Sequence, residues 1–348
     1  MKILIIIALL SIIGTSIWYV RAQRNKGTVT IAEFVSGSVK GNKAGEDPNR
    51  RLAIYLPPGY DKSKERYPVI YFLHGFGASE GVLRDLQMHD LLDEAIAAQR
   101  IKPVILVAPG SQTVYGGSFY TNSELTGNWA DYIAKDVVEY VDKNYRTLAK
   151  KESRGLCGHS MGGNGAIKLA MLFPEVYGSV YSMSPSVLNW GEEFGFDNPG
   201  FKIIHQSKTL KDVQVDLYAN ILLDMARTYS PNIGKAPFDA DLPVEFSGDS
   251  MSVRLDVATL WESNFPFVMV SKSGRHLRDL KGLKIDWGKN DEFRHIPVTC
   301  REFSKRLGFA KVNHETEEYE GGHGDKLTGA NGRINQHLLP FFAKTLSF

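Results

Sequence analysis

The chain has 348 residues and a formal net charge of +2, which is long enough for one large α/β domain with an insertion or for two ordinary domains. Its 43% hydrophobic and 23% charged residues indicate a globular protein with a substantial core. Basic and acidic residues are interspersed, which excludes the strongly basic character typical of nucleic-acid-binding proteins, so we expect no nucleic-acid partner.

The N-terminal segment differs from the rest of the chain. Lys2 is followed by an uncharged, largely apolar run over residues 3–20. Such a run is typical of a signal peptide or a single membrane anchor, which we place at residues 1–22. The positive charges at residues 21–26 favour a cytoplasmic location for that side of the run. On balance we predict an exported protein, periplasmic or extracellular, that contacts a membrane only if this segment is retained.

From residue 28 onward, apolar runs alternate with amphipathic stretches. Predicted strands cover residues 28–34, 51–56, 68–73, 104–108, 154–157, 179–183, 283–287 and 316–319. Predicted helices cover residues 90–99, 129–144, a stretch ending near 173, 297–307 and 334–346, the last interrupted by Pro340. This alternation indicates an α/β fold with a mostly parallel central sheet and helices on both faces.

The pattern loosens between residues 190 and 275. This stretch contains a predicted helix at 208–229 and a short one at 254–261. About 80 residues are more than a connection between two core strands needs. We interpret the stretch as a cap or lid inserted into one catalytic domain that covers residues 27–348. The alternative is a surface elaboration without a catalytic part.

One short motif carries the chemistry. Gly158-His159-Ser160-Met161-Gly162 stands between a predicted buried strand and a predicted helix. A G-x-S-x-G pattern in that context is typical of a nucleophile elbow, a sharp turn that presents the serine hydroxyl at the top of a sheet. Side chains at the flanking glycines would clash in so tight a turn. The pattern predicts Ser160 as a catalytic nucleophile.

Acyl transfer also needs a base and a group that orients the base. In α/β-hydrolases these groups follow in the chain order serine, acid, histidine. Asp291 follows a glycine turn after a late strand, and His323 stands between two glycines after the next strand. We predict Asp291 and His323 as partners of Ser160. Nearby acids that compete with Asp291 are Asp286, Glu292 and Asp325.

The developing oxyanion requires hydrogen-bond donors. His74-Gly75-Phe76-Gly77 follows the most apolar predicted strand. Half of the oxyanion hole in such enzymes lies at this place, and glycines let the backbone approach the substrate. We therefore predict the backbone N–H groups of Phe76 and Met161 as the two donors.

The sequence contains no metal-binding or cofactor-binding motif with the required residue spacing. The glycines at 75, 77 and 81 resemble a dinucleotide fingerprint but are one residue too far apart. The segment His314-Glu315-Thr316-Glu317-Glu318 lacks the second histidine of a zinc protease helix. Cys157 and Cys300 form no C-x-x-C motif, although a disulfide between them stays open for an exported protein. We predict no cofactor and no metal.

Together these motifs resemble the putative-esterase family of α/β-hydrolases, which includes esterase D, feruloyl and acetyl-xylan esterases and mycolyltransferases. The resemblance covers residues 50–190 and 282–345. The segments that carry it are Tyr55-Leu56-Pro57-Pro58-Gly59-Tyr60-Asp61, Tyr67-Pro68-Val69-Ile70-Tyr71-Phe72-Leu73-His74-Gly75, Gly158-His159-Ser160-Met161-Gly162-Gly163 and Gly288-Lys289-Asn290-Asp291. The resemblance implies the α/β-hydrolase fold and the same roles for Ser160, Asp291, His323, Phe76 and Met161.

The resemblance implies a serine esterase that cleaves carboxylic esters through an acyl-enzyme. Since S-formylglutathione hydrolases are cytosolic, the apolar N-terminus favours small-molecule or polysaccharide-linked esters outside the cell, such as feruloyl or acetyl esters. Two alternatives stay open at this point: an acyltransferase of the mycolyltransferase type, and a non-catalytic binding protein on a hydrolase fold. The segment at 190–275 is unlike the compact family members, so the sequence leaves the substrate open.

Overall fold

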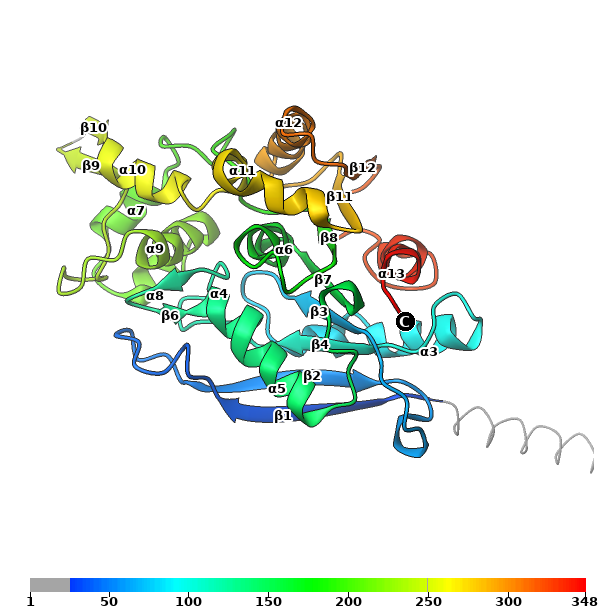
Figure 1. Ribbon diagram of the computed structural model, residues 1–348. Helices are drawn as coiled ribbons and strands as arrows, with labels where there is room; N and C mark the ends of the chain where they lie inside the picture. The colour runs from blue at the N-terminus through cyan, green and yellow to red at the C-terminus, as the bar shows by residue number, and fades with distance from the viewer. Residues whose placement is uncertain (1–25, 249) are drawn as a thin grey trace, which may run out of the picture.

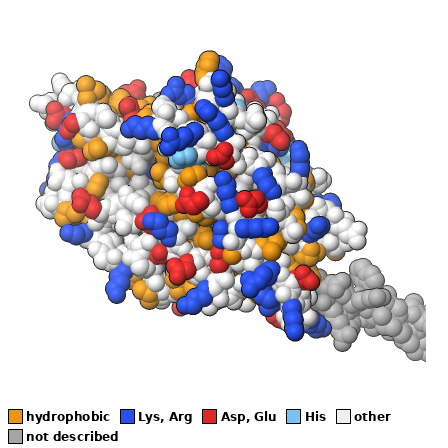
Figure 2. Space-filling view, in the orientation of Figure 1, with side chains coloured by type: hydrophobic (Ala, Val, Ile, Leu, Met, Phe, Trp, Pro, Cys, Tyr) orange, Lys and Arg blue, Asp and Glu red, His pale blue; other side chains and the backbone are white. Residues whose placement is uncertain are grey.

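The computed structural model describes residues 26–248 and 250–348 (Figure 1). The predicted signal peptide or anchor at residues 1–22 lies outside the described residues. Among the residues that are described, no helix has the length and apolarity needed to span a membrane. On the face seen in Figure 2, basic and acidic side chains are interspersed rather than gathered in one patch of either sign.

The centre of the molecule is an eight-stranded sheet with the order β1-β2-β4-β3-β7-β8-β11-β12. The strands are β1 (Thr28–Val35), β2 (Asn49–Leu56), β3 (Val69–Leu73), β4 (Ile105–Pro109), β7 (Arg154–His159), β8 (Ser179–Met183), β11 (Gly282–Gly288) and β12 (Glu315–Tyr319). The pairs β1–β2 and β2–β4 are antiparallel, and all other neighbours are parallel. The predicted mostly parallel sheet is therefore confirmed.

Helices cover both faces of the sheet, as the sequence predicts. One face packs against α4 (Trp129–Asp131), η2 (Tyr132–Val137), α5 (Val138–Asn144), α6 (Met161–Leu172), α11 (Pro266–Ser273), η4 (Gly274–Asp279) and α12 (His295–Phe309). The other face packs against α2 (Val82–Asp85), α3 (Met88–Ala97), η5 (Ile334–Leu338) and α13 (Leu339–Thr345). Short elements in the connections are η1 (Tyr60–Lys62), β5 (Asn122–Ser123), β6 (Gly127–Asn128) and η3 (Lys151–Ser153).

Strand β3 shows why an unbroken apolar run predicts a central strand. All five of its residues are buried. Because side chains alternate across a strand, Tyr71 packs into the core on one face while Ile70 and Phe72 pack into the core on the other. The two cysteines are also buried, and neither forms a disulfide.

The segment 190–275 ends with α11, which packs on the sheet. Before α11 it holds α7 (Gly200–Gln206), α8 (Leu210–Val213), α9 (Leu217–Tyr229), β9 (Val244–Ser247), β10 (Ser250–Val253) and α10 (Leu255–Glu262). These elements gather at one end of the molecule, at the upper left of Figure 1. Their core is continuous with that of the sheet, and it contains Trp190 stacked on the fully buried Trp261 with ring centroids 5.6 Å apart. Residues of this segment and of the sheet thus share one buried cluster.

Two helix predictions differ from the structure. The predicted helix at 208–229 is two helices: α8 ends at Val213, and Asp216 caps the start of α9 by accepting the Ala219 N–H at 2.8 Å. The predicted interruption at Pro340 is wrong, since η5 runs directly into α13 with the proline in the first turn of α13. A helical segment tolerates proline there because the wider π-type turn before it changes the hydrogen-bond register.

Lys168 on α6 joins the sheet layer to the segment 190–275. Its buried ammonium group donates to Thr121 Oγ1 and, at 3.0 Å, to Asn264 Oδ1. Burial lowers the pKa of Lys168 to about 7. An unfolded lysine has a pKa of about 10.4. Between about pH 7 and about pH 10 the unfolded chain therefore binds more protons at this group than the folded chain does. The free energy of unfolding consequently increases as pH rises through this range.

Replacing Lys168 with methionine removes this pH dependence. We expect the stability of the wild type relative to Lys168→Met to increase by about 2 kcal/mol between pH 7 and pH 9.5. Urea unfolding of both proteins at the two pH values measures the difference, and other titrating groups cancel in the comparison. A difference that does not change with pH would show that Lys168 stays charged in the folded protein.

Candidate functional site

Ser160 lies at the turn between β7 and α6, where the sequence predicts a nucleophile elbow. Its backbone angles are φ 59° and ψ −120°, in the positive-φ region that side chains other than glycine rarely adopt. Two residues later the helix passes close to β3, so that a Cβ atom on Gly162 would lie 2.0 Å from the carbonyl oxygen of Leu73. Only glycine fits at this close approach, and this explains why the G-x-S-x-G motif ends in glycine.

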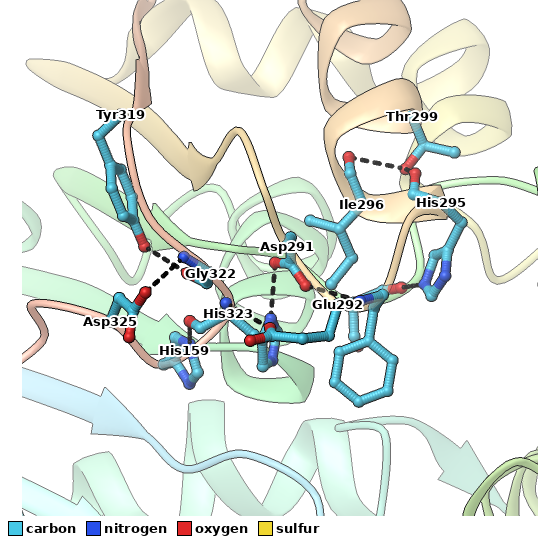
Figure 3. A network of polar contacts seen from close by, with 12 residues as sticks. His159, Asp291, Glu292, His295, Ile296, Thr299, Tyr319, Gly322, His323 and Asp325 are labelled. Carbon is cyan, nitrogen blue, oxygen red and sulfur yellow. Dashed lines mark hydrogen bonds and ion pairs between the residues drawn. The ribbon is translucent and has the colours of Figure 1, made fainter.

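Asp291 orients the imidazole of His323 (Figure 3). His323 Nδ1 lies 2.8 Å from Asp291 Oδ2, and the Asp291 side chain is fully buried. Because a carboxylate only accepts, Nδ1 carries the proton and Nε2 is left as the basic nitrogen. The other carboxylate oxygen, Oδ1, accepts the Phe293 N–H at 2.9 Å, which fixes the carboxylate in turn.

The competing acids have other partners. Asp286 lies within β11 and accepts from the Tyr181 hydroxyl at 2.6 Å and from Arg333 Nε at 2.7 Å. Glu292 accepts the backbone N–H of His323 at 2.8 Å, and Asp325 accepts that of Gly322 at 2.8 Å. Of these four acids, Asp291 contacts the imidazole.

Two rings flank His323. The ring of Phe293 lies edge-on at 4.8 Å, and that of His159 lies at 4.6 Å between centroids. His159 Nε2 is 2.8 Å from the carbonyl oxygen of His323, so this nitrogen donates. Burial and the neighbouring His323 lower the pKa of His159 to about 3, which keeps it neutral. The contacts that Glu292 and His159 make with the histidine backbone join distant segments, and no sequence pattern indicated them.

His74 orients the backbone where the first oxyanion donor is predicted. The Ser111 N–H donates to His74 Nε2 at 2.9 Å, so the proton of this neutral ring is on Nδ1, which donates to the Gly75 carbonyl at 2.8 Å. Burial lowers the pKa of His74 to about 4. In a trans peptide the N–H points opposite to the preceding C=O, so this contact sets the direction of the Phe76 N–H.

The second predicted donor, Met161, is the first residue of α6. The first N–H groups of a helix have no acceptor within the helix, and they carry the positive end of its dipole. Gly75 lies close to the serine, since a Cβ atom there would be 3.4 Å from Ser160 Cβ. The Phe76 and Met161 backbones therefore flank Ser160 from two elements.

Four of the five predicted site residues, Phe76, Ser160, Met161 and His323, line one cavity of about 310 Å³, and Asp291 contacts it only through His323. Its walls come from the sheet, from the 75–86 segment and from the segment 190–275, which contributes Phe194 and the α9 residues Leu217, Tyr218 and Ile221. The remaining lining residues are Phe72, Gly75, Ala78, Val82, Leu86, Phe119, His159, Ser186, Val187, Phe293, His295 and Leu327. Within the described part of the chain, no Lys, Arg, Asp or Glu lines this cavity. Nor do residues 26–248 and 250–348 contain three His, Cys, Asp or Glu side chains grouped to hold a metal ion.

Curated relatives share part of the sequence. Esterase Rv1288 of Mycobacterium tuberculosis is 28% identical over 287 residues, which cover 79% of this chain and 52% of that protein. An endo-1,4-beta-xylanase/feruloyl esterase of Xylanibacter ruminicola is 33% identical over 138 residues, 36% of this chain and 18% of that protein. The chain therefore spans about half the length of the mycobacterial relative and a smaller part of the other.

Solved structures share the fold. A ferulic acid esterase superposes with a TM-score of 0.63 and 16% identity, over 92% of this chain and 100% of that one. An S-formylglutathione hydrolase from Agrobacterium tumefaciens gives a TM-score of 0.59 and 16% identity, over 92% and 96% of the two chains. These neighbours confirm the α/β-hydrolase fold. The model of the family described as "Putative esterase" matches residues 46–327, most of the chain, and the protein belongs to that family.

Proposed function

We propose that this protein hydrolyses carboxylic esters through an acyl-enzyme on Ser160. The observation that carries the proposal is the hydrogen bond from His323 Nδ1 to the buried Asp291, with His323 lining the same cavity as a serine on a nucleophile elbow. This arrangement supplies a nucleophile, a base with a free nitrogen and a group that holds the base. The family to which the chain belongs supports the same chemistry.

The steps follow from the positions of these groups. His323 Nε2 accepts the Ser160 proton as Oγ attacks the ester carbonyl, and Asp291 stabilises the imidazolium that forms. The N–H groups of Phe76 and Met161 donate to the oxyanion. The imidazolium then protonates the departing alcohol, and water activated by His323 releases the acid. His323 carries each proton in this sequence, and the proton that it takes from water returns to Ser160 Oγ as the acid leaves.

The cavity supports an apolar ester as the substrate. Its walls are mostly aliphatic and aromatic side chains, and an isolated charge loses several kcal/mol of hydration in such surroundings. A feruloyl ester presents an uncharged aromatic acyl group, whereas S-formylglutathione carries charged groups. The apolar run at residues 3–20 supports an exported enzyme, released or held at a membrane by that segment, and N-terminal sequencing of the secreted protein tests this.

A matched pair of esters tests this preference. We expect kcat/KM for p-nitrophenyl butyrate to exceed that for p-nitrophenyl hemisuccinate by about 100-fold or more, because the second ester places a carboxylate of similar length in the apolar cavity. Methyl ferulate and methyl acetate extend the comparison to natural acyl groups. Equal rates for the neutral and the charged ester would contradict the substrate class.

Product analysis separates hydrolysis from acyl transfer. With glycerol or a sugar present, a hydrolase yields free acid, and an acyltransferase yields the new ester. The expected product is free acid. A folded sample that fails to react with a fluorophosphonate probe would instead favour a binding protein on this fold.

A further inference from the structure

A loop outside the catalytic groups packs against both predicted oxyanion residues. This loop, residues 113–117, follows β4, and its Gly116 carbonyl accepts the Gly77 N–H at 3.0 Å. A Cβ atom on Gly116 would lie 2.5 Å from the Phe76 ring, and one on Gly117 would lie 2.5 Å from Met161 Sδ. Because these contacts leave no free space, a shift of the 113–117 loop toward the site has to displace the Phe76 ring, the Met161 side chain or both.

The loop is held by a carboxyl group from the segment 190–275. Asp224 lies on α9 and is fully buried. Its Oδ2 accepts the Gly117 N–H at 2.7 Å, and its Oδ1 lies 3.3 Å from Thr113 Oγ1. The same hydroxyl oxygen is 3.0 Å from the Gly117 carbonyl, to which it donates. Asp224 therefore contacts both ends of the 113–117 loop.

The pKa shift of Asp224 is compatible with this role. Burial raises the pKa of Asp224 well above its usual range, which favours the neutral acid. In the neutral form a proton on Oδ1 donates to Thr113 Oγ1, the Thr113 hydroxyl donates to the Gly117 carbonyl, and the Gly117 N–H donates to Oδ2. Every polar atom of this closed ring has a partner, which removes the usual cost of burying a polar group.

Further contacts from other segments hold the same loop. Arg227, one turn after Asp224 on α9, lies over the Tyr115 ring at 4.1 Å. Glu46 accepts the Val114 N–H at 3.1 Å. The loop is thus held on several sides, and α9 supplies two of the groups that hold it.

We propose that Asp224 is a positioning residue for the esterase site: it fixes the 113–117 loop from α9, and through that loop it aligns the Phe76 and Met161 backbones with the oxyanion. The proposal rests on the function proposed above. Asp224 is not among the residues that line the cavity, so it acts through Gly116 and Gly117 and not on the substrate. The segment 190–275 is then required for the chemical step as well as for the cavity wall.

Two substitutions of similar size test the proposal. In Asp224→Leu the ring of hydrogen bonds is lost, and we expect kcat for p-nitrophenyl butyrate to fall by about 10- to 100-fold with KM within about threefold, since oxyanion donors act mainly in the transition state. Asp224→Asn reproduces the neutral acid, with its amide N–H donating to Thr113. We expect it to keep kcat within about threefold of the wild type.

The matched control is Arg254→Gln, which breaks ion pairs with Asp241 and Asp256 elsewhere in the same segment. We expect it to lower the melting temperature without changing kcat. An unchanged kcat in Asp224→Leu, or an equal loss in Arg254→Gln, would overturn the proposal.

If Asp224→Leu does not fold, Thr113→Val replaces it, and an unchanged kcat in Thr113→Val would also reject the role. If the turnover of the wild type does not depend on Ser160, the proposed function itself is rejected.

Discussion

Alanine in place of Ser160 is expected to lower kcat for p-nitrophenyl butyrate by about 10⁴-fold or more. The substitution removes the atom that forms the acyl-enzyme while it leaves the elbow backbone in place. Residual turnover then comes only from the oxyanion donors and substrate binding. Steady-state kinetics on purified protein measure the change, and circular dichroism checks that the fold is retained.

Ser79→Ala is the matched control for this experiment. Ser79 lies on the loop after Gly77, and its hydroxyl oxygen accepts the nearby Gly81 N–H at 3.2 Å. We expect this variant to keep kcat and to react with a fluorophosphonate probe, whereas Ser160→Ala does not react. Turnover that survives in Ser160→Ala would assign the nucleophile to another residue.

Asparagine in place of Asp291 is expected to lower kcat/KM by about 10³-fold or more. The amide can donate to His323 Nδ1 and so favours the tautomer with the proton on Nε2, which cannot accept a proton from Ser160. The amide also carries no charge to stabilise the imidazolium. The pH–rate profile and kcat/KM on the same ester measure both effects.

Asp286→Asn is the control, since Asp286 is also buried and also lies in the β11 region. Its partners are Tyr181 and Arg333, so this variant is expected to lose stability through the broken ion pair while kcat/KM stays within about threefold. If Asp286→Asn proves more damaging to kcat/KM than Asp291→Asn, the orienting acid is Asp286 and the observed geometry is not the catalytic one.

The sequence predicted the elements whose patterns are local. An apolar run of five residues is enough to identify β3, because a strand buried on both faces needs apolar side chains on each. The elbow is equally local, since the tight turn before α6 selects glycine within two residues of Ser160. The break at Asp216 could also have been found, because an aspartate before a new amphipathic run is a helix-capping pattern.

Other features depend on segments that are far apart in the chain. Asp224 and Gly117 are 107 positions apart, and His159 and His323 are 164 apart. Nothing around Asp224 in the sequence distinguishes it from a surface aspartate. Its burial follows from the packing of α9 against the 113–117 loop.

The sequence by itself determined the α/β order of elements, the elbow at Ser160 and the positions of Asp291 and His323. This was possible because tight turns and buried strands restrict which residue types occur at adjacent positions. Only the tertiary structure decided that Asp291 contacts His323, that His74 directs the Phe76 peptide and that the segment 190–275 reaches the site through Asp224. Such contacts arise when distant elements pack together, and the polar residues that make them are common in loops and helices of every kind.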